Sequence, residues 1–301
     1  MTARSQDIKA QDLEAASALP APATARLRWP RLKGFEWFAF GFVALLIAAA
    51  VLVDVIPGLA RPNFPYGDFS QPPEWSLNGL LGTDPLGRSI LSRVLHGART
   101  TLGIVAVATA IALAIGMTAG MLAGFYRGPV ERAVDLYANT MASLPPILVI
   151  LALIAVVGNS VLTMMLALGI LDIGVYARIA KGGVIAQNDR DYVLAARAMG
   201  ASDARILARE ILPNLVPALT AIVPPLVAGL IITEGSLSFL GYGIPPPAPS
   251  WGGMIASSTD LLSRFPLLVV GPILAIVLTV YSLNTIGDSL ARRLNDRNRN
   301  L

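Results

Sequence analysis

The sequence predicts an all-α, polytopic membrane protein with six transmembrane helices. The chain has 301 residues, of which 54% are hydrophobic and only 14% are charged, and its mean hydropathy is +0.64. A soluble chain of this length needs far more charge to cover its surface. The apolar residues also form solid runs of the roughly 20 residues that a helix needs to cross a membrane. A transmembrane β-barrel would have short segments of alternating hydrophobicity instead.

Six apolar runs are predicted to be the membrane spans. The fourth run is the least regular, because Asp172 interrupts it. The predicted spans cover residues 35–56, 101–125, 134–157, 161–180, 218–240 and 267–288.

Lysine and arginine predict the orientation of these spans. Most of the 23 basic residues lie in segments 1–33, 126–133, 181–217 and 289–301, which share one side of the membrane. Cytoplasmic segments carry an excess of Lys and Arg, so both termini are predicted to be cytoplasmic. The predicted outer side has only Arg61, Arg88, Arg93, Arg99 and Arg264.

The chain divides into three predicted parts. Residues 1–33 are polar and rich in Ala and Pro, which predicts a disordered cytoplasmic tail. No apolar region follows a short basic start, so the first span is predicted to be an uncleaved anchor and not a signal peptide. Residues 34–100 are predicted to hold the first transmembrane helix and an outer loop, and residues 101–301 the core transmembrane domain.

Two outer segments have distinct patterns. Residues 57–100 end in LGTDPLGRSILSRVLHGAR, whose apolar residues share one face at helical spacing and predict an interfacial helix. Residues 241–266 contain GYGIPPPAPSWGGMI, in which the proline run predicts a rigid extended loop. Trp251 is expected at the level of the lipid headgroups.

Glycines and prolines predict how the spans pack. Gly116, Gly120 and Gly124 repeat every four residues, so one face of the second span is bare and another helix can approach it closely. That second helix belongs either to the same subunit or to a partner subunit. Pro145-Pro146, Pro224-Pro225 and Pro272 are expected to kink or break their helices.

Composition argues against several classes of function. The chain has no cysteine and a single histidine, His96, which argues against a disulfide framework and a thiolate or histidine metal site. No glycine is followed by lysine, so the sequence has no phosphate-binding loop and is predicted to bind no ATP. No constellation of catalytic residues appears, so no cofactor and no enzyme activity are predicted. The net charge of +4 reflects membrane topology and does not predict nucleic-acid binding.

The stretch 189–217, DRDYVLAARAMGASDARILAREILPNLVP, carries the most information. It lies between long apolar segments, yet holds four arginines and four acids. Asp189 or Asp191 can cap a first short helix, and Gly200 allows the turn that ends it.

A second short helix is predicted after this turn. Ser202 or Asp203 can cap its start, and Pro213 is expected to stop it before the fifth span. Two short helices of this kind form a rigid knob at the inner face of the membrane.

This stretch resembles the cytoplasmic loop of binding-protein-dependent ABC importer permeases. The order A-A-x-x-x-G, nine residues, a variable pair and then L-P runs from Ala195 to Pro213. It looks most like the peptide and nickel branch of these permeases. Two positions depart from the usual pattern, since Leu194 replaces a glutamate and Glu210 replaces an isoleucine. The departure at Leu194 puts in doubt any role for an acid at that position.

Two further stretches extend the resemblance over nearly all of the chain after residue 33. LGTDPLGRSILSRVLHGAR resembles the amino-terminal signature of the family, and residues 234–255, EGSLSFLGYGIPPPAPSWGGMI, resemble its outer-loop signature. The chain therefore looks like the second-type permease of a dipeptide or oligopeptide importer, with a type I importer fold.

The resemblance implies partners and a place in the cell. It implies a bacterial cytoplasmic membrane, a homologous second permease, two ATP-binding subunits and an extracytoplasmic substrate-binding protein. ATP would be hydrolysed on the partner subunits, and the pore would work by alternating access. The residues implied to couple this chain to the ATPases within loop 189–217 are Ala195, Ala196, Arg197, Gly200, Asp203 and Pro213.

The implied substrates are di- or oligopeptides, with glutathione and peptide antibiotics also open. A nickel or nickel-chelate importer is the alternative within the family. An ion-coupled secondary transporter is a rival from another class, but such a chain usually contains an inverted repeat, which is not evident here.

Several charged residues are candidates for contact with substrate or binding protein. Glu234 and Asp172 lie within predicted spans, where an acid either faces a substrate pathway or has a structural partner. On the outer side, the candidates for contact with the binding protein are Arg88, Arg93, Arg99 and Trp251. Anionic lipid headgroups would attract these arginines equally well.

Overall fold

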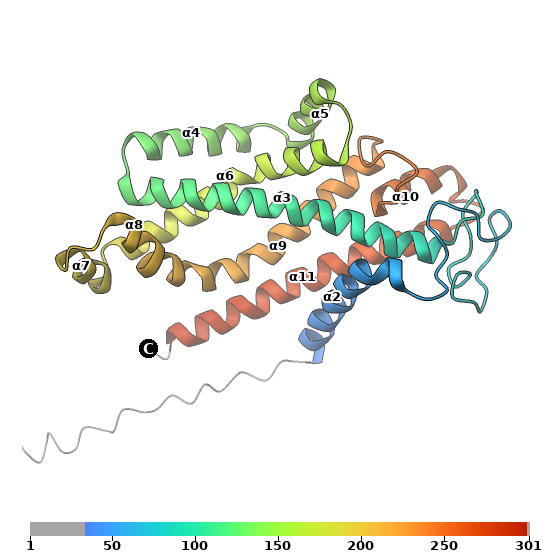
Figure 1. Ribbon diagram of the computed structural model, residues 1–301, viewed down its shortest axis with the longest axis horizontal. Coiled ribbons are helices and arrows are strands. Elements are labelled where there is room, and N and C mark those ends of the chain that lie inside the picture. The colour runs from blue at the N-terminus through green and yellow to red at the C-terminus, as the bar shows by residue number, and fades with distance from the viewer. Residues whose placement is uncertain (1–33, 300–301) are drawn as a thin grey trace, which may run out of the picture. The chain divides into compact units, whose positions relative to one another are not determined.

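A computed structural model describes residues 34–299, and their side chains up to Leu294. The predicted tail, residues 1–33, lies outside the described residues. The described chain is built of helices, and its only β-type pairing is an isolated bridge between Thr83 and Ser89 (Figure 1). The α-helices are α2 (Gly34–Leu52), α3 (Ile90–Tyr126), α4 (Pro129–Ser143), α5 (Pro146–Val157), α6 (Val161–Asn188), α7 (Asp191–Ala198), α8 (Asp203–Arg205), α9 (Leu212–Phe239), α10 (Trp251–Ser258) and α11 (Leu267–Arg299).

Five stretches of helix are long and apolar enough to cross a membrane, and a bent pair of helices can form a sixth span. The bent pair is α4 and α5, which meet at 96°. The third predicted span, 134–157, is therefore bent in two, which confirms the prediction that Pro145-Pro146 kinks or breaks its helix. Leu144 and Pro145 each precede a proline and have extended backbone, with ψ of 138° and 122°. A residue before proline disfavours the helical conformation, so the proline pair breaks the helix.

The second predicted span begins much earlier than expected. Residues 90–100 are not a separate interfacial helix, as predicted, but the first turns of the 37-residue helix α3. Ser89 caps its start by accepting a hydrogen bond from the Ser92 backbone N–H at 3.3 Å. Ile90 is buried against Met254 and Leu268. Because nothing after this cap interrupts the helix and its first turn is buried, it continues without a break.

Helices α3 and α6 form the most extensive helix pair of the described chain and run side by side (Figure 1). The predicted glycine face lies in this contact. A Cβ atom on Gly116 would be 2.6 Å from the Ile173 carbonyl oxygen, and one on Gly124 would be 2.8 Å from the Lys181 carbonyl oxygen. A Cβ atom on Gly120 would overlap the Ala177 backbone. The bare face therefore packs within the subunit, which confirms one of the two alternatives.

Buried apolar residues gather into two main clusters. The larger cluster joins α2, α3, α5, α6, α9 and α10, and Ile104, Ile150 and Leu168 are among its fully buried side chains. A second cluster lies where α3, α6 and α9 meet the loop that holds α7. Prolines lie inside α9 and α11 without breaking either helix, so only the pair at 145–146 breaks its helix.

Candidate functional site

The loop between α6 and α9 folds as a compact helical unit. Its first helix, α7, starts after Arg190, which has no side-chain capping bond. The prediction that Asp189 or Asp191 caps this helix is therefore wrong. Asp191 lies in the first turn instead, where its negative charge interacts favourably with the positive end of the helix dipole.

Helix α7 ends in a turn that requires Gly200. The Ala201 N–H donates to the Ala196 carbonyl at 3.0 Å, and the Gly200 N–H donates to the Arg197 carbonyl at 2.9 Å. These two bonds form a Schellman motif, in which the residue after the helix adopts a left-handed conformation. Gly200 has φ of +77°, so the predicted helix and turn are confirmed.

One face of α7 is buried against the ends of the long helices. Val193 and Ala196 lie in the second cluster with Val184 of α6 and with Ile206 and Ile211, which follow the turn. Burial of these apolar side chains stabilises the loop as a rigid body and fixes which face remains outside.

Polar contacts reinforce this anchoring. The Arg197 guanidinium donates to Asn188 Oδ1 at 2.6 Å and lies 5.2 Å from the centre of the Phe125 ring. The Tyr192 hydroxyl donates to Gln187 Oε1 at 2.5 Å, and partial burial raises the pKa of Tyr192. The sequence analysis did not single out Gln187 and Asn188, the two amides at the end of α6 that accept these hydrogen bonds.

The opposite face of the loop is exposed and carries both apolar and charged side chains. Met199 at the turn is 81% exposed, and Leu194 is 47% exposed. Of the six residues predicted to couple to ATPases, only Ala196 is buried, and the exposed ones are Ala195, Arg197, Gly200, Asp203 and Pro213. The loop thus presents small, apolar and charged groups on a frame whose other face is buried.

The second part of the loop differs from its prediction. Pro213 does not stop a helix, because it lies in the first turn of α9, directly after the π-helix Ile206–Ile211. The wider turn of the π-helix changes the hydrogen-bond pattern just where proline has no N–H to donate. Asp203 begins α8, and Ser202 takes the cap position without a side-chain capping bond.

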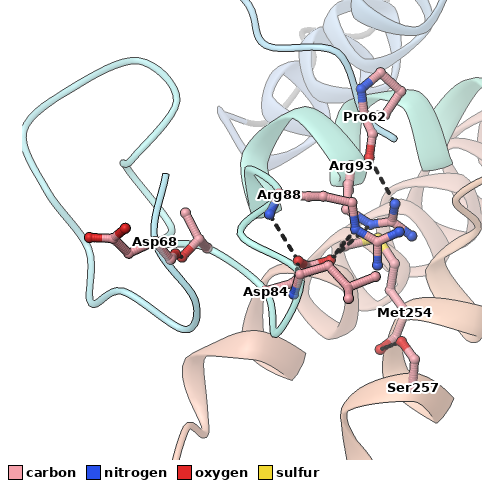
Figure 2. A network of polar contacts seen from close by, with 9 residues as sticks. Pro62, Asp68, Asp84, Arg88, Arg93, Met254 and Ser257 are labelled. Carbon is pink, nitrogen blue, oxygen red and sulfur yellow. Dashed lines mark hydrogen bonds and ion pairs between the residues drawn. The ribbon is translucent and has the colours of Figure 1, made fainter. Parts of the chain in front are cut away.

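A network of charged residues secures the segment that precedes α3 (Figure 2). Asp84 Oδ1 accepts hydrogen bonds from the backbone N–H groups of Leu86 and Arg88, both at 2.9 Å. Its Oδ2 accepts from Arg88 Nε at 2.6 Å and lies 3.7 Å from Arg93 Nε. Arg93 also donates to the Pro62 carbonyl at 2.8 Å. Asp84 was missed by the sequence analysis, although an Asp-Pro pair followed by Gly is typical of a turn.

This network determines which of the residues predicted to contact a binding protein have an exposed side chain. Arg88 and Arg93 are largely buried around Asp84, whereas Arg99 is exposed and pairs with Asp54. Trp251 has no exposed surface, and its Nε1–H donates to the Val94 carbonyl at 3.0 Å. The prediction that Trp251 anchors at the headgroups or contacts a binding protein is therefore wrong, because its ring fills the space beside Gly97.

The two acids predicted for a substrate pathway have different surroundings. Glu234 is fully buried in α9, and its Oε1 accepts a hydrogen bond from the Ser238 hydroxyl at 2.7 Å. Asp172 is only partly buried and lines a cavity of about 170 Å³ between α4, the start of α5, α6 and α9. Arg178, which no sequence pattern singled out, lines the same cavity.

Known proteins resemble the chain in sequence and in fold. Residues 116–300 match the family described as binding-protein-dependent transport system inner membrane component. The glutathione transport system permease protein GsiD of Shigella dysenteriae serotype 1 (strain Sd197) is 36% identical over 257 residues, which cover 85% of this chain and 84% of that protein. GsiD of Escherichia coli O157:H7 has the same identity and coverage.

A solved structure supports the fold. A chain of the MetNI methionine ABC transporter, in an inward-facing conformation, superposes with a TM-score of 0.56 at 19% identity. The match covers 67% of this chain and 96% of that chain. The long match to the family and the extended identity to GsiD agree with the helical membrane fold. The chain therefore belongs to the family of inner membrane components of binding-protein-dependent transport systems.

Proposed function

We propose that this chain is one of two permease subunits that form the pore of an ATP-driven importer for small peptides, with glutathione as the first candidate. The observation that carries the substrate class is the 36% identity to the glutathione permease GsiD over most of both chains. The chain itself is not an enzyme, because ATP hydrolysis in this family belongs to partner subunits.

The loop with α7 is the proposed joint to an ATPase. Its buried face and its bonds to Gln187 and Asn188 make it move with α6, while Leu194 and Met199 offer an apolar contact. A force applied to this loop would pass directly into α6 and α9. ATP can favour one pore conformation only through contacts that differ between the two conformations, and the loop is where such contacts are proposed.

The loop and the outer network are attached to opposite ends of α3. Arg197 lies over Phe125 near the end of this helix, and Arg93 binds the Pro62 carbonyl near its start (Figure 1). If the loop faces the cytoplasm, the segment around Asp84 faces the binding protein, and both chain termini are cytoplasmic. Arg99 is then the one predicted arginine with enough exposed surface to contact that protein.

Purification of the tagged chain from native membranes tests this assignment. A second permease and one or two ATPases are expected to copurify, and the associated binding protein is expected to hold a small peptide. Uptake of glutathione into proteoliposomes should require ATP. A chain that transports when purified alone would contradict the proposal, and a binding protein loaded with nickel would support the metal alternative.

A further inference from the structure

The cavity beside the bend between α4 and α5 combines an apolar wall with two opposite charges. Its apolar lining includes Leu168, Leu171 and Leu230, which come from α6 and α9. Pro146, at the start of α5, also lines it. The charged lining residues are Asp172 and Arg178, both on α6.

Asp172 has an unusual place for an acid. It lies eleven residues after the start of α6 at Val161, or about 16 Å along the helix at 1.5 Å per residue, so it is far from either end. Within residues 34–294 its carboxylate has neither a hydrogen bond nor an ion pair. An acid at this depth is costly unless it faces water or a ligand, and such acids commonly mark transport pathways.

Arg178 supplies the opposite charge at the same cavity. One of its nitrogens, Nη2, donates to the Ala138 carbonyl and lies 3.3 Å from Asn139 Oδ1. A guanidinium has five N–H donors, so several remain for another acceptor. The bonds to α4 hold the guanidinium at the rim of the cavity without neutralising it, because neither acceptor is charged.

An acid and a base that face one cavity without pairing to each other match a molecule with both charges. A free peptide has an ammonium group at one end and a carboxylate at the other. We propose that this cavity is a contact site for zwitterionic peptides in the pore, where Asp172 binds the ammonium group and Arg178 binds the carboxylate. The inference rests on the proposed function as a small-peptide importer.

The size of the cavity suits a transient contact. Pockets that enclose a whole drug-sized ligand usually measure about 300–1,000 Å³, whereas this one has about 170 Å³. It therefore does not enclose a whole peptide: the two charged groups of the peptide contact Asp172 and Arg178, while the rest of the molecule stays outside the cavity. A pathway site needs such weak binding, because the substrate must leave it again.

The test measures ATP-driven uptake by the complete complex in proteoliposomes with its binding protein. The probes are glutathione and dialanine, each at a concentration that saturates the binding protein. Asp172→Asn should lower uptake about tenfold, since a charged hydrogen bond to the ammonium group is lost. ATPase activity stimulated by the binding protein should stay within about twofold. Asp172→Glu should restore most of the uptake, because it returns the charge.

Arg178 is tested with the same peptide and its C-terminal amide. Arg178→Gln should lower uptake of the free acid about tenfold and leave uptake of the amide within about twofold, because only the acid has the carboxylate. Equal loss for both forms would overturn the role of Arg178. Arg178→Lys provides a charged variant for the case that glutamine disturbs α4.

Asp288→Asn, at an exposed acid on α11, is the matched control and should transport normally. Wild-type uptake by Asp172→Asn would overturn the inference while leaving the proposed function intact. A wild-type complex that hydrolyses ATP but carries neither peptide would instead overturn the proposed function.

Discussion

At the scale of single residues, backbone conformation and burial decide what each side chain can do. Gly200 has a left-handed backbone that its position after α7 demands, and no atom lies within 4 Å of a Cβ built on it. For Trp251, by contrast, the residues that surround the ring determine its role, and its amphipathic side chain does not. Its position inside the chain could not be predicted from the sequence, since the space beside Gly97 exists only once α3 and α10 pack together.

Gly200→Ala should therefore destabilise the loop through its backbone and not through a clash. A left-handed conformation costs a residue with a Cβ atom roughly 1–2 kcal/mol. We expect a lower melting temperature for the purified chain and less copurifying ATPase. Gly182→Ala is the matched control, because Gly182 is also unobstructed but has an ordinary helical φ. Equal effects of the two substitutions would contradict this account of Gly200.

Glu234 is expected to be structural because it is fully buried and accepts the Ser238 hydroxyl. Glu234→Gln keeps an acceptor for that hydroxyl, so uptake should remain within about twofold of wild type. Glu234→Leu removes the acceptor and should lower the free energy of unfolding by about 1–3 kcal/mol. If the Glu234→Gln complex is stable but its uptake is strongly reduced, then Glu234 lines the substrate pathway and is not only structural.

At the scale of helices, the sequence predicted the runs of apolar residues better than their ends. Apolar length identifies a span, but it does not report where a helix continues beyond the membrane, as α3 does from Ile90. The sequence also does not show which proline pair breaks its helix. The pair at 145–146 breaks its helix, whereas the pair at 224–225 lies inside α9. Gly287 brings α11 close to the Ala221 carbonyl, the group that loses its helical partner at Pro225.

The sequence predicted the secondary structure of the first half of the loop that holds α7, but not that of the second half. Alanines followed by Gly200 are a local signal for a helix and a turn, so short-range chemistry was sufficient. The π-helix before Pro213 depends on burial of Ile206 and Ile211 against α3 and α6, which is not visible in the sequence. Asp172 and Arg178 were equally hard to connect, because the cavity that they share is lined by residues of four helices.

The contact between α3 and α6 should tolerate no side chain at its centre. A Cβ atom on Gly120 would overlap the Ala177 carbonyl and lie 2.8 Å from the Ala177 Cα. Gly120→Ala should therefore separate the two helices and lower stability by about 1–3 kcal/mol. Thermal unfolding in detergent measures the effect, with Gly103→Ala on the same helix as an unobstructed control. A melting temperature equal to wild type would show that the helices can separate without cost.

At the scale of the whole molecule, the chain is one component of a binding-protein-dependent transport system. Its described helices have apolar surfaces suited to lipid or to a second permease, and its longest helix joins the two regions where the other partners are proposed to dock. The exposed face of α7 at one end and the network around Asp84 at the other are built differently. The first has exposed apolar side chains, Leu194 and Met199, on a buried frame, and the second is a cluster of charges that positions a long loop.

Met199 provides a test of the proposed ATPase joint that leaves the fold untouched. Its side chain is 81% exposed at the turn after α7, so Met199→Glu removes no buried contact. The melting temperature should change little, because exposed substitutions usually alter stability by less than about 0.5 kcal/mol. A charge in the centre of an apolar interface has no partner and costs much more, so copurification of the ATPases and peptide uptake should both fall at least about tenfold.

Leu86→Glu is the matched control for this test, because Leu86 is 54% exposed and lies in the segment attached to the start of α3. This variant should keep its ATPases, since the same chemical change has been made far from the proposed joint. If Met199→Glu retains the ATPases and Leu86→Glu loses them, then the ATPases dock on the segment around Asp84. The orientation of the chain in the membrane would then be the reverse of the one proposed.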